Sequence, residues 1–171
     1  MKKYLSILII ASIGLGSALA GNPDRAGSAG ASQLLINPWA ASNGLAGANM
    51  ASALGLESTF LNVAGLAFIG QTELISANSI YLGGTGIYIN SVGFGTRIGS
   101  SAVLGFTVTS MNFGDIGITT EDLPEGGIGD FSPAFSNIGI SLAKEFSNSI
   151  YAGFTLRIIG ESISNVKASG V

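Results

Sequence analysis

Two residue types are missing from this chain of 171 residues, which contains no cysteine and no histidine. Without cysteine there is no disulfide and no thiolate metal site. Without histidine there is no Ser-His nucleophile, no two-histidine zinc motif and no usual general base. We therefore expect no enzyme activity, no bound metal and no cofactor.

Charge is also scarce, because only 10% of the residues are charged, against about 25% in soluble domains. The mean hydropathy is nevertheless +0.53. A soluble protein with so few charged residues would tend to aggregate. The lipid-facing residues of a membrane protein, in contrast, must be uncharged. The acidic excess also argues against nucleic acid as a partner, because phosphates require a basic footprint.

One long apolar run exists, at the start of the chain. Lys2 and Lys3 precede an apolar stretch over 5–15, and small residues follow, as in a secretory signal peptide with cleavage between Ala20 and Gly21. A buried N-terminal helix is the alternative. Removing residues 1–20 takes away two of the seven basic side chains and leaves five against ten acidic ones, a net charge of −5. After this segment no apolar run of about 18 residues remains, so we expect no transmembrane helix.

From about residue 87 to residue 162, apolar residues alternate with small or polar ones. In the clearest run, Phe154, Leu156 and Ile158 share one face, and Thr155 and Arg157 lie on the other, because side chains alternate along a strand. The sequence predicts strands over about 91–98, 102–109, 137–145 and 149–162, and a less regular one over 72–82.

The connections between these runs alternate in length. Gly99-Ser100 and Ser147-Asn148 are tight turns, Gly83 to Gly86 is a further turn, and the connection from Gly114 to Ser132 is long. Bacterial outer-membrane barrels have short periplasmic turns and longer external loops, and a tilted strand of about 9–11 residues crosses a bilayer. The predicted fold class is therefore all-β, a transmembrane antiparallel β-barrel of which about five strands are present in residues 71–171. A soluble antiparallel sheet with one buried face is the alternative.

Residues 21–70 have a different character, since they are rich in Ala, Gly, Ser and Asn and do not alternate. We expect a partly helical plug or hatch inside the barrel, or a cap on its periplasmic side, with short helices over 26–35 and 46–54. Trp39 has two interpretations, an anchor at the membrane interface or packing of the plug against the wall. The many glycines suit strands whose inner face is crowded by such a plug.

Four charged residues fall on the predicted lumen face. They are Arg97, Glu145, Arg157 and Glu161. They would line a polar path, bind a partner's carboxylate, or form a structural network, and the network is the simpler interpretation. The long loop carries five carboxylates, but their spacing does not match a calcium loop, so we expect a solvated external loop.

Several motifs of the chain occur together in one family. They are Arg-Ala-Gly-Ser-Ala-Gly-Ala over 25–31, Ala-Gly-Ala-Asn-Met-Ala over 46–51, Leu-Asn-Val-Ala-Gly-Leu-Ala over 61–67 and Met-Asn-Phe-Gly-Asp-Ile over 111–116. In this order and spacing they resemble the N-terminal part of the PorV/PorQ-like outer-membrane proteins of the FadL-type barrel group. The resemblance covers roughly residues 24–171 and implies a turn at Asn62 and Gly65 just before the first strand.

The chain departs from that family in two ways. Val63 stands where the family has proline, which loosens the expected turn. Five strands are also too few to close a barrel in a bilayer, where bacterial single-chain barrels start at eight. We therefore expect the sequence to continue, in phase, with more strands.

The resemblance implies a component of type IX protein secretion and surface attachment in the outer membrane of a Gram-negative cell. Its partners would be outer-membrane lipid and secreted cargo proteins or subunits of the secretion machinery. A FadL-like transport channel for hydrophobic compounds is the alternative, and an outer-membrane barrel of another role is a third.

Overall fold

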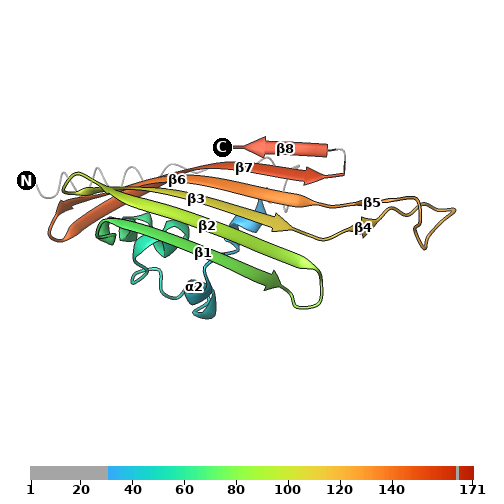
Figure 1. Cartoon of the computed structure of the whole chain (residues 1–171), viewed down its shortest axis with the longest axis horizontal. Helices are drawn as coiled ribbons and strands as arrows, with labels where there is room; N and C mark the ends of the chain where they lie inside the picture. Colours follow the sequence, from blue (N-terminus) through green and yellow to red (C-terminus); the bar gives the residue numbers. More distant parts are fainter. Residues whose placement is uncertain (1–30, 165) are drawn as a thin grey trace, which may run out of the picture. The chain divides into compact units, whose positions relative to one another are not determined.

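The computed structural model describes residues 31–164 and 166–171. The expected signal cleavage site at Ala20 and Gly21, and residues 26–30 of the first expected helix, lie outside the described residues. Six strands form one antiparallel sheet in the order β1-β2-β3-β6-β7-β8 (Figure 1). The strands are β1 (Thr72–Tyr81), β2 (Ile87–Ile98), β3 (Ala102–Asn112), β6 (Ala134–Ser147), β7 (Ile150–Ile163) and β8 (Val166–Gly170).

The all-β prediction is confirmed, and the sheet is not closed, because β1 and β8 form its two edges. All five predicted strands are present, each starting or ending within a few residues of the expected position. β8 was not predicted, since its five residues contain only Val166 and Ala168 as apolar positions. Short runs of this kind carry too little periodicity to be distinguished from a loop.

The connections occupy the two ends of the sheet as expected. Tight turns at 99–101 and 148–149 lie at one end, and Gly99 adopts a φ of 66° there, which favours glycine. The turn over 82–86 and the long loop over 113–133 lie at the other end (Figure 1). This loop contains a short antiparallel pair, β4 (Ile116–Gly117) and β5 (Asp130–Phe131), which the sequence did not predict.

From residue 31 on, where the structure describes it, the segment before the sheet contains four short helices. They are η2 (Ser32–Leu35), α2 (Ala40–Gly44), η3 (Gly55–Phe60) and η4 (Val63–Phe68), of which all but α2 are 3-10 helices. The helix expected over 46–54 was wrong: residues 45–52 form turns, because Ala46 and Gly47 both adopt positive φ, 50° and 76°. Trp39 is buried and meets Phe60 of η3 edge to face at 6.2 Å, so it packs within the helical segment itself. This contact corresponds neither to an anchor at the membrane interface nor to packing against the sheet.

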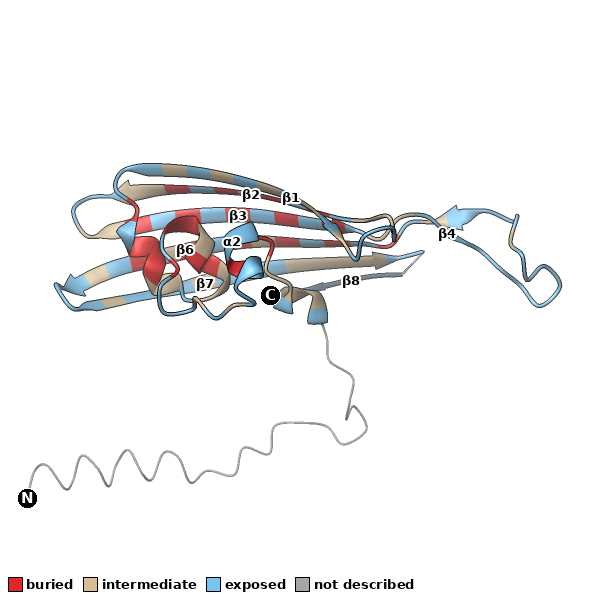
Figure 2. Ribbon diagram, turned by 90° about the horizontal axis from the view of Figure 1, so that it is seen from below, coloured by how far each residue is buried: buried red, intermediate tan, exposed pale blue. Residues whose placement is uncertain are grey.

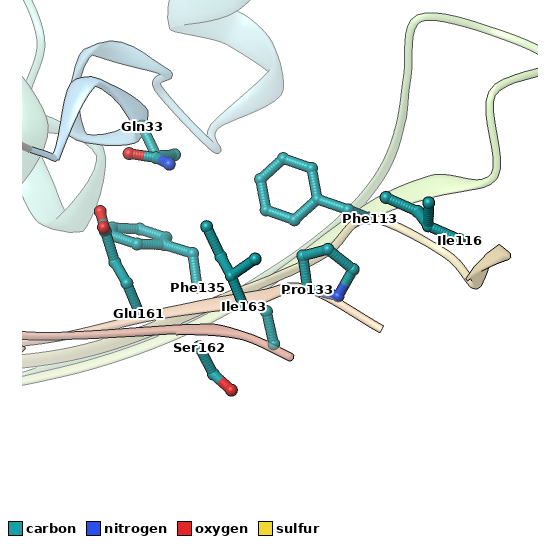
Figure 3. Close-up of a pocket in the computed structure, with 9 residues that line it drawn as sticks. Gln33, Phe113, Ile116, Pro133, Phe135, Glu161, Ser162 and Ile163 are labelled. Atoms are coloured by element: carbon teal, nitrogen blue, oxygen red, sulfur yellow. The ribbon is translucent and has the colours of Figure 1, made fainter. Parts of the chain in front are cut away.

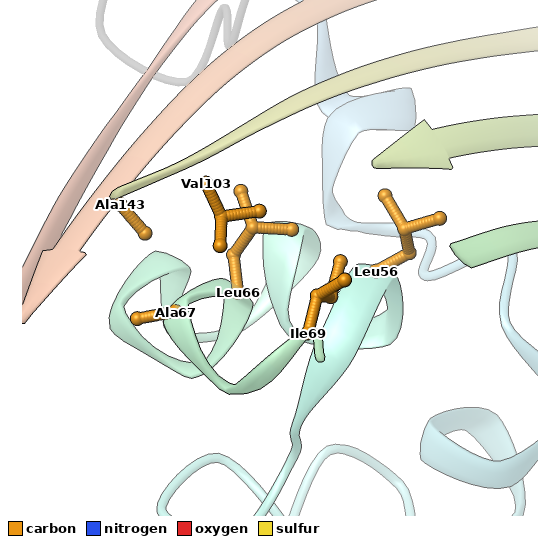
Figure 4. Close-up of a cluster of buried hydrophobic side chains, with 6 residues drawn as sticks. All are labelled: Leu56, Leu66, Ala67, Ile69, Val103 and Ala143. Atoms are coloured by element: carbon orange, nitrogen blue, oxygen red, sulfur yellow. The ribbon is translucent and has the colours of Figure 1, made fainter. Parts of the chain in front are cut away.

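Helices η3 and η4 pack against one face of the sheet, which we call the inner face (Figure 2). Their apolar side chains form a cluster with Val103 of β3 and Ala143 of β6 (Figure 4). The helical members of this cluster are Leu56, Leu66, Ala67 and Ile69. A second cluster joins Ile89, Met111 and Phe135 nearer the loop end.

Glycines of the inner face make this close packing possible. A Cβ on Gly105 would lie 3.0 Å from Leu66, and one on Gly95 would lie 2.6 Å from Ile69. On Gly153 a Cβ would lie 2.9 Å from both the side chain and the carbonyl oxygen of Val63. Glycine weakens a strand entropically, and here the absent side chains leave space that the helices fill.

We predict that Gly153→Ala destabilises the chain by about 1–3 kcal/mol, because the new methyl group meets the backbone of Val63, which cannot rotate away. Gly70→Ala is the matched control, since no atom lies within 4 Å of its Cβ position. Denaturant unfolding of both variants under identical conditions measures the difference. Equal unfolding midpoints for the two variants would show that Val63 of η4 does not pack closely against Gly153 of β7.

Candidate functional site

The outer face of the sheet is the most extensive candidate surface. Its residues alternate with the buried ones along β2, β3 and β6. The register aligns apolar residues of five strands in one row, Leu74, Phe94, Phe106, Ile140 and Leu156. These side chains are 43% to 73% exposed, which is unusual for so many large apolar residues on one surface.

Two neighbouring rows extend this surface. One contains Val92, Val108, Ile138 and Ile158, and the other contains Leu104, Leu142 and Phe154. The next row toward the loop end is polar: Asn78, Asn90, Ser110 and Ser136. We call the three apolar rows the belt. It is bounded toward the loop by the polar row and toward the tight turns by Lys144 and Phe146.

The charges of the sheet are distributed unevenly between its faces. Within the described strands, the outer face carries no carboxylate, and its cations are Lys144 near the tight turns and Lys167 near the loop. Lys144 lies over the ring of Phe146 at 5.5 Å. Long lysine side chains at the margin of an apolar surface keep their stems on it and their charged ends in water.

The four predicted charged residues all lie on the inner face, and the structure does not bring them together into one site. Arg97 donates hydrogen bonds to the carbonyl oxygens of Ala67 at 2.8 Å and Ile69 at 2.6 Å. These carbonyls lie at the C-terminal end of η4, where a cation is favourable. Arg97 therefore attaches the end of η4 to β2.

Arg157 attaches the other helix. Its Nη2 donates to the carbonyl oxygen of Thr59 at 2.7 Å, and its guanidinium lies 4.2 Å from the centre of the Phe60 ring. The side chain extends from β7 over Gly139, which leaves space for it. The hydrogen bonds of both arginines go to backbone carbonyls. Each arginine satisfies helix-end carbonyls that no helical amide reaches.

The two predicted glutamates occupy opposite ends of the inner face. Glu145 pairs with Tyr151 across β6 and β7 close to the tight turns. Glu161 lies near the loop end, and its Oε1 is buried without a hydrogen-bond partner. They therefore do not form a carboxylate pair.

Asn62 and Gly65, the residues of the family-like turn, have structural roles. The Asn62 side chain accepts a hydrogen bond from the amide of Ala64 at 3.3 Å and caps η4. A Cβ on Gly65 would meet the Ala53 carbonyl oxygen and lie 2.7 Å from the Cβ of Ser58. Helix η4 begins at Val63 even though the family proline is absent, because the asparagine cap satisfies an amide of the first turn.

Glu73 is a structural residue that the sequence did not reveal. The amide of Leu56 donates to both oxygens of its carboxylate, at 3.3 Å each. A lone carboxylate on the inner side of β1 was the available signal, but its partner is a backbone amide seventeen residues away in the sequence. A hydrogen bond to a backbone amide cannot be predicted from the sequence, because every residue except proline carries the same amide.

The five carboxylates of the long loop are the candidate metal ligands of this chain. In the part of the chain that the structure describes, no group of three or more Asp or Glu residues is arranged to hold a metal ion. Asp115 instead accepts a hydrogen bond from the Ser132 hydroxyl across the base of the loop.

No helix among residues 31–164 and 166–171 is long and apolar enough to cross a bilayer.

Comparison with known proteins adds no relative: no family model, no curated protein and no solved structure matches the chain. The function is therefore argued from the surfaces described above.

We predict that Arg157→Gln increases amide hydrogen exchange in residues 55–62, because η3 loses its tie to β7. Arg97→Gln, the matched variant, should increase exchange in residues 66–71 instead. Hydrogen exchange followed by mass spectrometry separates the two peptides. If both variants exchanged as the wild type does, the arginines would not be holding the ends of η3 and η4, and their guanidinium groups would be available to another ligand.

Proposed function

We propose that this chain forms part of the wall of a transmembrane β-barrel in a bacterial outer membrane. The observation that carries the proposal is the belt, a continuous apolar surface across five strands that is free of carboxylates within the described residues. A soluble sheet with the same alternation would bury its apolar face, whereas here the buried face is rich in Gly, Ser and Thr.

The dimensions of the belt support a lipid environment. On β7 the apolar outer positions continue past the belt, through Ala152 beside Lys144, to Ile150. From Ile150 to Ile158 this apolar stretch covers eight residue steps, about 27 Å along the strand at about 3.4 Å per residue. At a tilt of about 45°, this corresponds to about 19 Å, and adding the polar row gives about 24 Å, close to the ~25 Å apolar band of outer-membrane barrels. The polar row and Tyr88 would then lie at one interface, and Lys144 with Phe146 at the other.

Closure of this sheet into a barrel needs further strands between β8 and β1. An open strand edge in lipid leaves backbone groups without partners, at several kcal/mol each. Helices η3 and η4 would occupy the lumen, held there by Arg97, Arg157 and Glu73. The Gly-rich inner face and the helices that fill it are what a hatch inside a barrel requires.

Within this class, we propose a PorV/PorQ-like role in type IX protein secretion. The support comes from the order of family-like motifs and from the loop over 113–133, which extends past the sheet (Figure 1). This loop exposes Leu123 and Ile128, each 51% accessible, beside its carboxylates. No lysine or arginine occurs from residue 98 to residue 143. A surface that is both apolar and acidic suits docking of a protein partner with basic residues around an apolar patch.

We predict that Leu104→Lys prevents assembly into membranes, because Leu104 lies midway along the apolar stretch, and a lysine near the bilayer midplane costs about 2–4 kcal/mol. Ser110→Lys is the control, six residues along the same outer face in the polar row, where the cost falls to about 0–1 kcal/mol. Membrane fractionation and heat-modifiable electrophoretic mobility measure assembly. A Leu104→Lys protein that assembles as well as Ser110→Lys would exclude lipid contact at the belt.

For the secretion role, we predict that deleting the gene leaves cargo proteins off the cell surface, and that the wild-type gene restores them. A gene carrying Leu123→Ser and Ile128→Ser should restore less than half of the surface cargo, while its protein still reaches the membrane. Thr119→Ala in the same loop is the control. Surface proteolysis of intact cells quantifies displayed cargo.

Unchanged display after deletion would refute the secretion role without touching the barrel proposal. If the purified protein then retained fatty acid, the FadL-like alternative would take its place.

A further inference from the structure

One cavity lies outside every role assigned so far. It has a volume of about 220 Å³ and lies where η2, the base of the long loop and the ends of β6 and β7 meet (Figure 3). Its walls are mainly apolar and include Phe113, Pro133, Phe135 and Ile163. For comparison, an apolar cavity of about 150 Å³ holds benzene.

Two oxygen atoms at this cavity lack partners. Oε1 of Glu161 and Oε1 of Gln33 are both buried, and neither accepts a hydrogen bond. Figure 3 shows both side chains on one side of the cavity, with the ring of Phe113 across from them. A buried acceptor without a donor costs about 1–3 kcal/mol, and more when it is charged. Such groups in a cavity indicate what a ligand must supply.

Among the described residues, no basic side chain supplies the required donor. Arg157, four residues before Glu161 on the same face, donates to Thr59, and its Nη1 has no acceptor. Lys167 lies opposite Ser162 in the register of β7 and β8, on the outer face, and does not donate to Oε1 of Glu161. Of the residues that line the cavity, Glu161 is the one that carries a charge.

The geometry points to a binding site for a small primary amine in its ammonium form, with an apolar, preferably aromatic, body of about six carbon atoms. The ammonium group would donate to Glu161 and Gln33, forming the charge-assisted hydrogen bond that the carboxylate lacks. The rings of Phe113 and Phe135 favour a cation near their faces, and the apolar body fills the rest of the cavity. A neutral alcohol of the same shape has a single O–H, so it would satisfy only one of the two oxygens and would not neutralise the carboxylate. An anionic ligand would leave both oxygens unsatisfied.

This inference goes beyond the proposed function, because it depends on the cavity and not on lipid contact or secretion. The full-length protein purified in detergent is titrated with 4-fluorobenzylammonium, and binding is followed by the fluorine resonance. Empty micelles give the background. Matched probes of the same shape are 4-fluorobenzyl alcohol, which is neutral, and 4-fluorobenzoate, which is anionic.

We expect saturable binding of the ammonium probe alone, and about tenfold weaker binding to Glu161→Gln, which loses the charge and keeps the shape. Gln33→Met should weaken binding severalfold by removing the amide acceptor. Glu145→Gln, on the same face at the opposite end of the sheet, should bind as the wild type does. If Glu161→Gln does not fold, Gln33→Met and the three-probe comparison decide the question.

Equal binding of the alcohol or the benzoate would overturn the inference, because the cavity would then select for shape alone. Unchanged binding to both variants, or no saturable binding of the ammonium probe up to about 10 mM, would overturn it as well.

Discussion

The close contact of η3 and η4 with the inner face is the interaction on which the rest of the described structure depends. Leu56 and Leu66 lie against strand positions occupied by glycine, so the helices approach the sheet at distances that any side chain there would prevent. This packing takes place where the inner face carries glycine. Larger apolar residues of the inner face, Ile89, Met111 and Phe135, form the second cluster nearer the loop end, and the apolar residues of the belt are exposed on the outer face.

Polar ties hold this packing in register. Arg97, Arg157 and Glu73 each reach from a strand to the backbone of a helix end, where carbonyl or amide groups lack helical partners. Short 3-10 helices have too few internal hydrogen bonds to persist alone. The sheet thus stabilises the helices through their ends as well as through the leucines, and charged residues on the inner face are used for attachment rather than for chemistry.

The two ends of the sheet have separate roles in the proposals. The end with tight turns contributes Lys144 and Phe146, which suit a membrane interface. The loop end carries the acidic, partly apolar loop and, below it, the cavity with Gln33 and Glu161. Recognition in this protein is therefore assigned to the loop end, and anchoring to the belt between the two ends.

The sequence alone determined the five long strands of the sheet, the turns between them and which of their side chains share a face, because a two-residue period is a local property of the chain. It did not reveal β8 or the short pair of β4 and β5, whose runs are too short for such a period. It also placed Arg97, Glu145, Arg157 and Glu161 on one face. The tertiary structure decided what that face touches: carbonyls of η3 and η4 for the arginines, and a cavity for Glu161. It also replaced the helix expected over 46–54 by turns and moved the helical residues to 55–68. These outcomes depend on contacts between residues far apart in the chain and on backbone partners, which no spacing of side chains encodes.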